Sequence, residues 1–102
     1  MYDVYVIDLR KLVGFEWDVG NSDKSYERHG VTVREAEALF TDEKVLLVED
    51  VHHSQKEKRC IAIGKIEEGV VLFCAFTIRS NKIRIISVRK ANKKERSAYE
   101  AT

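Results

Sequence analysis

The sequence predicts an α+β fold in which a four-stranded antiparallel sheet follows two short helices and precedes a third. Runs of β-branched and aromatic residues succeed one another between residues 45 and 90 without a helical pattern between them. Helix-capping patterns precede residues 33–40 and 93–100. A chain of 102 residues is long enough for one modest core, so residues 1–102 are predicted to form a single domain.

Two short β-favouring runs come first. Residues 2–9 (YDVYVIDL) are compatible with a strand and with a frayed leader. In the second run, residues 15–18 (FEWD), alternation places Phe15 and Trp17 on one face, where they are expected to pack on the core.

Two helices are predicted next. Residues 21–28 have a polar helical pattern that ends at His29-Gly30, and Gly30 is expected to stop this helix in a left-handed conformation. Thr32 and Glu35 have the spacing of a capping box, which opens a helix through Phe40. Its apolar face comprises Val33, Ala36, Leu39 and Phe40.

The strand-rich half begins with residues 45–50 and 59–65, which flank the polar loop 51–58. A four-residue loop, 66–69, would pair Cys60 with Ala75 and turn Cys74 to the other face, so no disulfide is expected. Both cysteines are interpreted as small buried hydrophobic residues. A zinc site has little support, since no third cysteine or suitably spaced histidine accompanies them.

Residues 70–90 are predicted to form a hairpin. A loop of two residues, Ser80-Asn81, or of four, 79–82, gives one register. The expected pairs are Thr77 with Arg84, Ile78 with Ile83, Phe76 with Ile85 and Ala75 with Ile86. Leu72, Cys74, Phe76, Ile78, Ile83 and Ile85 then form a core face, while the other face carries Thr77, Arg79, Lys82 and Arg84 toward the tip. A last helix is capped by Asn92 and Glu95 and runs to about residue 100.

Positive charge is concentrated in residues 70–96. This stretch holds eight of the 18 Lys and Arg but one of the 17 Asp and Glu, so it carries +7 while the remainder carries −6. Clustered cations are typical of a surface that binds a phosphate backbone or an acidic protein partner. They also keep the edge of a hairpin soluble.

The composition excludes other classes of protein. No run of about 18 apolar residues exists, so no transmembrane helix is expected. Acidic residues interrupt the N-terminal apolar run, which argues against a signal peptide and favours the cytoplasm.

Short motifs in a fixed order resemble the BrnT family of toxins. They are Phe15-Glu-Trp-Asp18, Gly20-Asn21, Arg28-His29-Gly30-Val31, Glu35-Ala36, Phe40, Asp50, His53-Ser54, Glu57-Lys58-Arg59, Ala62-Ile63-Gly64, Phe76-Thr77-Ile78-Arg79, residues 83–89 (IRIISVR), Asn92-Lys93-Lys94-Glu95-Arg96 and Tyr99-Glu100. Residues 1–14 precede the part that resembles the family and are expected to be an N-terminal extension. The dipeptide Lys90-Ala91 departs from the family pattern.

The resemblance implies a RelE-like fold and the toxin of a type II toxin-antitoxin system. Such a toxin is an endoribonuclease that cleaves mRNA and arrests translation. The implied partner is a BrnA-like antitoxin with a ribbon-helix-helix DNA-binding part, and the complex would bind operator DNA through the antitoxin and repress its own operon.

Cleavage without a metal or other cofactor requires a base for the 2′-hydroxyl, cations around the phosphate and an acid for the leaving oxygen. Arg79 and Arg84, with Thr77 beside them, are the expected phosphate ligands because arginine binds phosphate oxygens in pairs. His53 is assigned the proton transfers, on the strength of the resemblance. Glu57 is either the base or a partner of Arg59 at the strand entry.

The remaining basic residues are assigned to RNA binding with structural alternatives beside them. Arg59 and Arg89 are expected on the core side of the sheet, as braces or paired with acids. The other candidates, Lys82, Lys93, Lys94 and Arg96, lie on the hairpin and the last helix, where a solvated helix face is the alternative for the last three.

Several conspicuous residues are given no catalytic role. His29 is interpreted as a helix-end cation, His52 as a surface residue, and Tyr99 as packed beneath the last helix. Trp17 could stack on a base, but core packing is the preferred interpretation. A different class of function is kept as the alternative for the whole chain: a non-catalytic basic module that docks an acidic protein partner.

Overall fold

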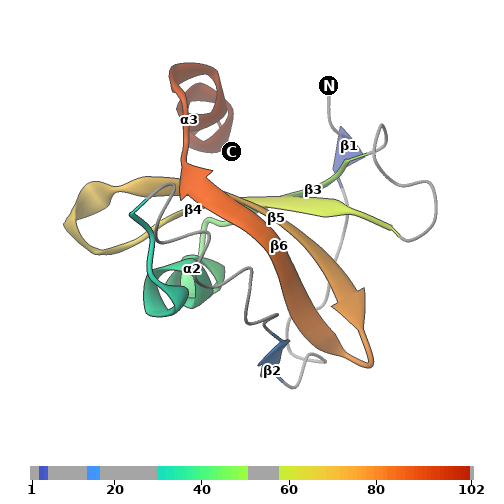
Figure 1. Cartoon of the computed structure of the whole chain (residues 1–102). Coiled ribbons are helices and arrows are strands. Elements are labelled where there is room, and N and C mark those ends of the chain that lie inside the picture. Colours follow the sequence, from blue (N-terminus) through green and yellow to red (C-terminus); the bar gives the residue numbers. More distant parts are fainter. Residues whose placement is uncertain (1–2, 5–13, 17–29, 51–57, 102) are drawn as a thin grey trace.

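Three long antiparallel strands form the centre of the protein, and shorter strands extend the sheet on both sides (Figure 1). The structure is a computed structural model and describes residues 3–4, 14–16, 30–50 and 58–101. The strands are β1 (Asp3–Val4), β2 (Gly14–Glu16), β3 (Leu46–Glu49), β4 (Cys60–Lys65), β5 (Val71–Arg79) and β6 (Lys82–Lys90). Their order across the sheet is β1-β3-β4-β5-β6-β2.

The α+β class is confirmed, but the predicted count of four strands is wrong. The described part of the chain has a six-stranded sheet, because the two N-terminal runs add short strands to its edges. β2 pairs in parallel with β6, so the sheet is mixed. The predicted helix at residues 21–28 lies outside the described residues. Gly30, expected to end it, does have a positive φ of 66°.

The turn between β5 and β6 has two residues, which is one of the two lengths that the sequence left open. Ser80 and Asn81 have φ values of 50° and 62°, which matches the turn type that suits the twist of a two-residue hairpin. The predicted pairs of Thr77, Ile78 and Phe76 are confirmed. The fourth pair is wrong, because a bulge between Ala75 and Phe76 places Ala75 opposite Ser87.

The connection between β4 and β5 is one residue longer than predicted. Lys65 pairs with Val71, and the five residues between them include the 3-10 turn η4 (Glu67–Gly69). A hydrogen bond of 2.8 Å from the Ile66 N–H to the Val70 carbonyl closes this connection. Since side chains alternate along a strand, one extra residue turns every β4 side chain to the other face relative to β5.

Cys60 therefore lies on the opposite face from the one predicted. Cys60 lies opposite Phe76, and Cys60 and Cys74 belong to the same core cluster, so the prediction that they occupy different faces is wrong. Both are free and buried. Burial, with a smaller effect of the Glu49 carboxylate, raises the pKa of Cys60 to about 11, and burial raises the pKa of Cys74 as well. Thiols with such pKa values are poor nucleophiles, so the structure supports their interpretation as buried hydrophobic residues.

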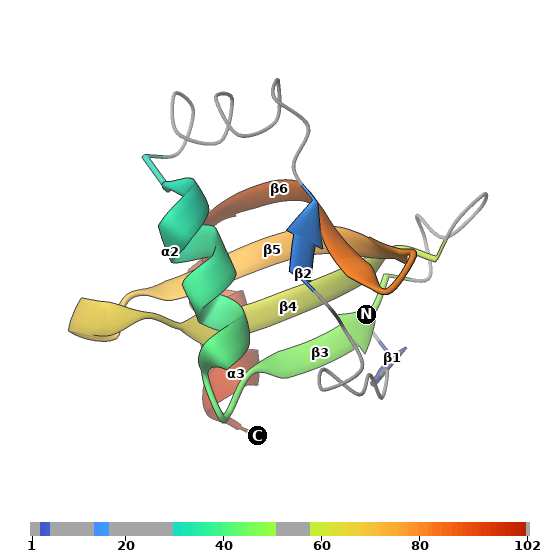
Figure 2. The same cartoon turned by 90° about the horizontal axis from the view of Figure 1, so that it is seen from below.

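The two described α-helices lie on opposite faces of the sheet (Figure 2). The helix α2 (Val33–Ala38) continues into the 3-10 turn η2 (Leu39–Thr41) and packs on the face that carries Phe76 and Ile85. The predicted capping box is present, with a bond of 3.1 Å from the Glu35 N–H to the Thr32 hydroxyl. We call this side of the sheet the α2 face.

The C-terminal helix α3 (Lys93–Glu100) covers part of the opposite side, which we call the α3 face. Its predicted cap is confirmed by a bond of 2.8 Å from the Glu95 N–H to the Asn92 side chain. Tyr99 packs into the core of this face, as predicted. Neither helix in the described ranges is long and apolar enough to cross a membrane.

A hydrogen bond of 2.5 Å from the Tyr99 hydroxyl to Asp42 ties α3 to the segment before β3. Burial raises the pKa of the Asp42 carboxyl, but hydrogen bonds from the Lys65 N–H, the Tyr99 hydroxyl and the Lys44 N–H outweigh burial, so this pKa lies below its usual value. Burial and the bond to Asp42 raise the pKa of Tyr99 to about 12. The bond therefore persists through the neutral pH range and fixes α3 over one end of its face.

Candidate functional site

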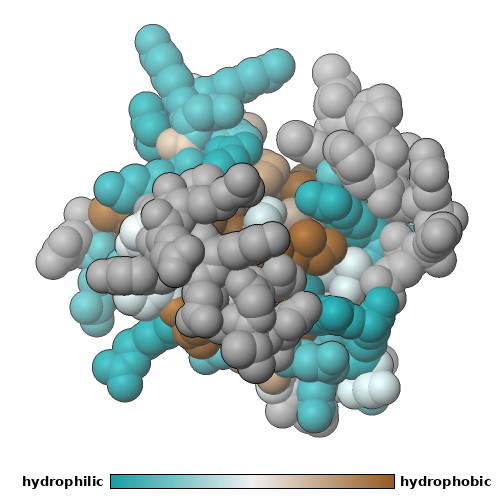
Figure 3. Space-filling view, in the orientation of Figure 1, coloured by the Kyte–Doolittle hydropathy of each residue, from teal (hydrophilic) through white to brown (hydrophobic). Residues whose placement is uncertain are grey.

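α3 covers only one end of the α3 face. Ala91 and Tyr99 pack there against Ile63, Val71 and Phe73. The opposite end, toward the β5–β6 turn, carries polar and charged side chains from five strands or their immediate ends. Figure 3 shows hydrophilic residues over α3 and around the tip of the hairpin.

These side chains form a row across the sheet. The Asp50 N–H donates to the Arg59 carbonyl at 2.8 Å, which extends the pairing of β3 with β4 by one step. The register of Cys60 with Phe76 places Arg59 beside Thr77, Thr77 is opposite Arg84, and Arg84 is opposite Glu16. We call Asp50, Arg59, Thr77, Arg84 and Glu16 the polar row. Across the sheet, the functional groups follow in the order carboxylate, guanidinium, hydroxyl, guanidinium and carboxylate.

The two arginines of the polar row flank the hydroxyl. Adjacent strands lie about 4.8 Å apart, so the Cα atoms of Arg59 and Arg84 are roughly 10 Å apart with Thr77 between them. Arginine side chains are long enough for both guanidinium groups to contact one group placed above Thr77. An anion with several oxygens, such as a phosphate, fits this arrangement.

Thr77 is the unusual member of the row. Its side chain is buried, with 4% exposed, and its hydroxyl has no hydrogen-bond partner among the described residues. A buried hydroxyl left unsatisfied costs about 1–3 kcal/mol, so such groups call for an explanation. A ligand oxygen that binds between Arg59 and Arg84 would supply the partner.

Arg59 does not lie where the sequence predicted. It was expected on the core side of the sheet with Arg89, but the longer β4–β5 connection turns it to the α3 face beside Thr77. The predicted pairing with an acid is present, since its Nε lies 3.8 Å from the Asp50 carboxylate. The side chain of Arg59 remains 31% exposed, so it can still contact a ligand.

Arg79 and Lys82 extend the basic surface to the hairpin tip. They lie opposite each other, both are exposed, and alternation puts them on the face of Thr77 and Arg84. The structure thus brings together Arg59, Thr77, Arg79, Lys82 and Arg84 of the predicted site.

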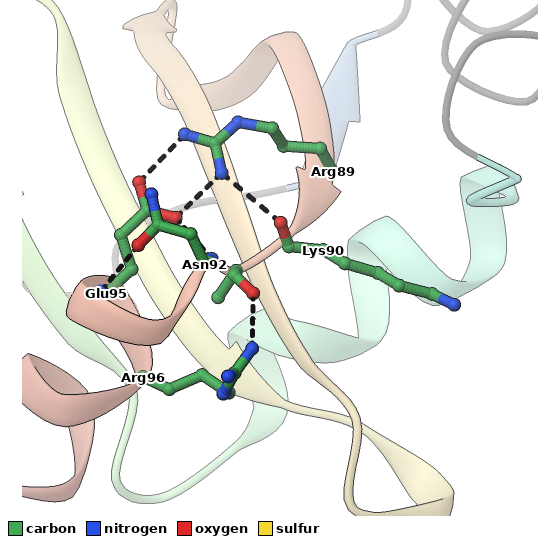
Figure 4. Close-up of polar contacts among 6 residues, drawn as sticks. Arg89, Lys90, Asn92, Glu95 and Arg96 are labelled. Carbon is green, nitrogen blue, oxygen red and sulfur yellow. Dashed lines mark hydrogen bonds and ion pairs between the residues drawn. The ribbon is translucent and has the colours of Figure 1, made fainter.

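Arg89 has a different environment at the other end of β6. Its guanidinium lies 4.1 Å from the centre of the Phe73 ring and makes two hydrogen bonds to Glu95, of 2.7 and 2.8 Å (Figure 4). Burial alone would raise the pKa of Glu95. The hydrogen bonds from Arg89 and the Asn92 N–H have the larger combined effect, so this pKa lies below its usual value. The prediction that Arg89 pairs with an acid is confirmed, and this pair attaches α3 to β6. The prediction that it lies on the core side with Ile83 and Ile85 is wrong, because the bulge turns it to the α3 face, opposite Phe73.

The basic residues of α3 form a second cationic region. Lys93 and Lys94 are exposed, and Arg96 donates to the Ala91 carbonyl at 2.9 Å (Figure 4). β6 separates this region from the hairpin tip by nine residues, or roughly 25–30 Å. A ligand that contacts both regions must therefore be extended, as a nucleic-acid strand is.

His53, Glu57, Trp17 and His29 lie outside the described residues. In the sequence, His53 and Glu57 lie between Asp50 and Arg59, which are members of the polar row. No group of three or more metal-ligating side chains occurs within the described ranges.

Sequence reasoning gave no role to Asp50 or Glu16. Asp50 is two residues after Val48 and therefore on the same face, a signal that the alternation along residues 45–50 already contained. Glu16 could not be placed from the sequence, because its position depends on the parallel pairing of β2 with β6.

The fold and the row define a small α+β protein whose sheet carries one arginine on each side of a buried threonine hydroxyl. The family model described as "Ribonuclease toxin, BrnT, of type II toxin-antitoxin system" matches residues 17–95. The chain therefore belongs to the BrnT family of toxins, and the predicted resemblance is confirmed.

A solved structure is consistent with this assignment. The crystal structure of the Brucella abortus ribonuclease toxin BrnT is 18% identical in sequence, with a TM-score of 0.57 over 79% of this chain and 99% of that chain. This likeness shows a shared fold. No curated protein matches the sequence. As a type II toxin of a family described as ribonucleases, the protein has an antitoxin as its partner.

Proposed function

We propose that the protein is a RelE-like, metal-independent endoribonuclease that cleaves mRNA in the cytoplasm and arrests translation. The observation that carries the proposal is the polar row, in which two arginines flank a buried hydroxyl that has no hydrogen-bond partner among the described residues. In a ribonuclease toxin, that arrangement suits the phosphate of the cleaved linkage.

The reaction would use the 2′-hydroxyl of the substrate as the nucleophile. A base, His53 or Glu57, removes its proton, the 2′-oxygen attacks the adjacent phosphorus, and an acid protonates the departing 5′-oxygen. Arg84, Thr77 and Arg79 would hold the phosphate and stabilise the charge that develops on its oxygens. The positions of His53 and Glu57 in the sequence, between Asp50 and Arg59 of the row, support these roles.

The other cations would hold the flanking RNA. Lys82 extends the hairpin surface, while Lys93 and Lys94 lie beyond the far end of β6. Arg59 belongs to the row itself. Arg89 and Arg96 make contacts within the protein, so their contribution to RNA binding would come mainly from their charge.

The proposed partner is a BrnA-like antitoxin with a ribbon-helix-helix part, and the complex would bind operator DNA through that part. A short neighbouring reading frame for such a protein would support this partner.

Expression of the wild type beside Arg79→Ala and His53→Ala tests the function. We expect the wild type to arrest growth and break transcripts, and both variants to relieve the arrest while they remain folded. Cleavage by the purified wild type should persist in EDTA, because none of the proposed steps uses a metal. Tolerated expression of the wild type, with tight binding to an acidic partner and intact RNA, would instead favour a non-catalytic binding module.

Thr77→Val is expected to separate stability from activity. Valine keeps the shape of threonine and removes the buried hydroxyl, so the free energy of unfolding should rise by about 1 kcal/mol. RNA cleavage should fall roughly tenfold, the equivalent of one hydrogen bond to the phosphate. Denaturant unfolding and a cleavage assay on the same preparation measure both effects. A valine variant as active as the wild type would remove Thr77 from the site.

A further inference from the structure

Asp50 is a buried carboxylate at the end of β3, with 5% of its surface exposed. Its backbone N–H bonds to the Arg59 carbonyl, and its Oδ2 lies 3.8 Å from the Arg59 Nε. The two residues therefore share a backbone hydrogen bond, while their side chains form an ion pair that is too long for a hydrogen bond. Burying a carboxylate is costly, and an opposite charge at this distance offsets part of that cost.

The positions beside this pair on the α3 face are apolar. One step along the strands toward α3, the corresponding positions are Val48, Ile61 and Ala75, all buried and in register across β3, β4 and β5. The apolar cluster under α3 thus continues up to the polar row and stops there. Apolar residues of similar volume often stabilise a fold as well as a buried ion pair does, so packing alone gives no reason for charges at this position.

The bulge lies at the same boundary. The register of β5 with β6 shifts between Ala75 and Phe76, next to Thr77. Bulges increase the local twist and redirect neighbouring side chains, and they are common beside active sites. The extra residue of the bulge, Ile86, lies two positions after Arg84 on β6. On the other side of Thr77, the carboxylate of Asp50 lies 3.8 Å from the Arg59 Nε.

We propose that Asp50 is a positioning residue that orients Arg59, so that Arg59 and Arg84 bind the same RNA phosphate from opposite sides of Thr77. Asp50 does not touch the substrate. It restrains the position of the Arg59 guanidinium by electrostatic attraction, since the buried carboxylate lies 3.8 Å from Nε. This inference rests on the proposed ribonuclease function and adds Asp50 and Arg59 to the residues on which the rate depends.

The test is a double-mutant cycle on the full-length protein with wild type, Asp50→Asn, Arg59→Ala and the double variant. The measurements are single-turnover RNA cleavage and thermal unfolding. We expect Asp50→Asn to lower the cleavage rate roughly tenfold and Arg59→Ala roughly 100-fold, in line with the effects of residues that orient a ligand and of those that contact it. The double variant should be no slower than Arg59→Ala alone, since Asp50 acts only through Arg59.

Glu49→Gln is the matched control. Glu49 is the neighbouring acid on the same strand, it alternates to the α2 face, and it pairs with Lys58 at 3.7 Å. Removal of its charge should leave the cleavage rate unchanged.

Three results would overturn the inference. Asp50→Asn could keep the wild-type rate, which would make the pair structural. Its effect could persist in the Arg59→Ala background, which would make Asp50 act independently of Arg59. A wild type that cleaves no RNA would overturn the proposed function as well, whereas the first two outcomes leave that function intact.

Arg59→Lys provides a second test of the inference, which remains valid even if the Asp50→Asn variant does not fold. Lysine keeps the charge beside Asp50 but lacks the planar fork, so the cleavage rate should fall while the unfolding temperature changes little. A lysine variant with the wild-type rate would exclude a role for the orientation of the guanidinium.

Discussion

Arg84→Ala is expected to lower RNA cleavage by roughly 100- to 1,000-fold while the protein remains folded. Arg84 is partly exposed on β6, opposite Thr77 and beside Glu16, and no member of either hydrophobic core depends on its charge. Its guanidinium would face the phosphate in the transition state, where negative charge increases. Loss of this group therefore affects the rate far more than the stability.

Single-turnover cleavage of a defined RNA, with circular dichroism as a check on folding, measures this effect. Arg34→Ala is the matched control, because Arg34 is an exposed arginine of α2 on the opposite face of the sheet. Both variants lose one positive charge, so only a local role of Arg84 separates them. Equal activity of the two variants would place the phosphate elsewhere.

Gly64→Ala is expected to lower the free energy of unfolding by about 2–3 kcal/mol, the upper part of the range for overpacked cores. A Cβ at Gly64 would lie 2.7 Å from the Leu39 carbonyl oxygen and 3.3 Å from the Val45 side chain. The first neighbour is backbone of the 3-10 turn η2, so it cannot move aside as a flexible side chain would. The glycine permits η2 to pack directly on β4.

Thermal unfolding measures this loss, which should correspond to a decrease of roughly 10–20 °C in Tm for a domain of this size. Gly30→Ala is the control, because alanine at this position would strain the backbone conformation without a steric clash. Gly30 has a φ of 66°, and a Cβ there meets no atom of the described residues within 4 Å, so its cost should be near 1 kcal/mol. Equal losses for the two variants would show that the contact with Leu39 has no effect.

Local patterns predicted much of the fold. The turn residues Ser80 and Asn81 and the alternation beside them predicted the register at the tip of the hairpin, and both capping boxes were recognisable from residues three positions apart. These features depend on neighbours in the chain. The sequence therefore contained the information needed to predict them.

Non-local features were missed. The length of the β4–β5 connection was misjudged by one residue, because whether Val70 belongs to the turn depends on a hydrogen bond that the sequence does not reveal. That residue decides which face Arg59 occupies. The polar row spans five strands or their ends, so the sequence predicted only the part that lies within one hairpin, Thr77, Arg79 and Arg84. The alternation along residues 45–50 indicated the face of Asp50, but its position beside Arg59 depends on the pairing of β3 with β4.

A structure of the protein bound to an RNA that carries a 2′-deoxy substitution at the cleavage site would test the central claim most directly. The account predicts that the phosphate of the uncleaved linkage lies over Thr77, with its oxygens at about 3 Å from the guanidinium groups of both Arg59 and Arg84. RNA bound to the α2 face, or a phosphate held by α3 alone with the polar row unchanged, would contradict it.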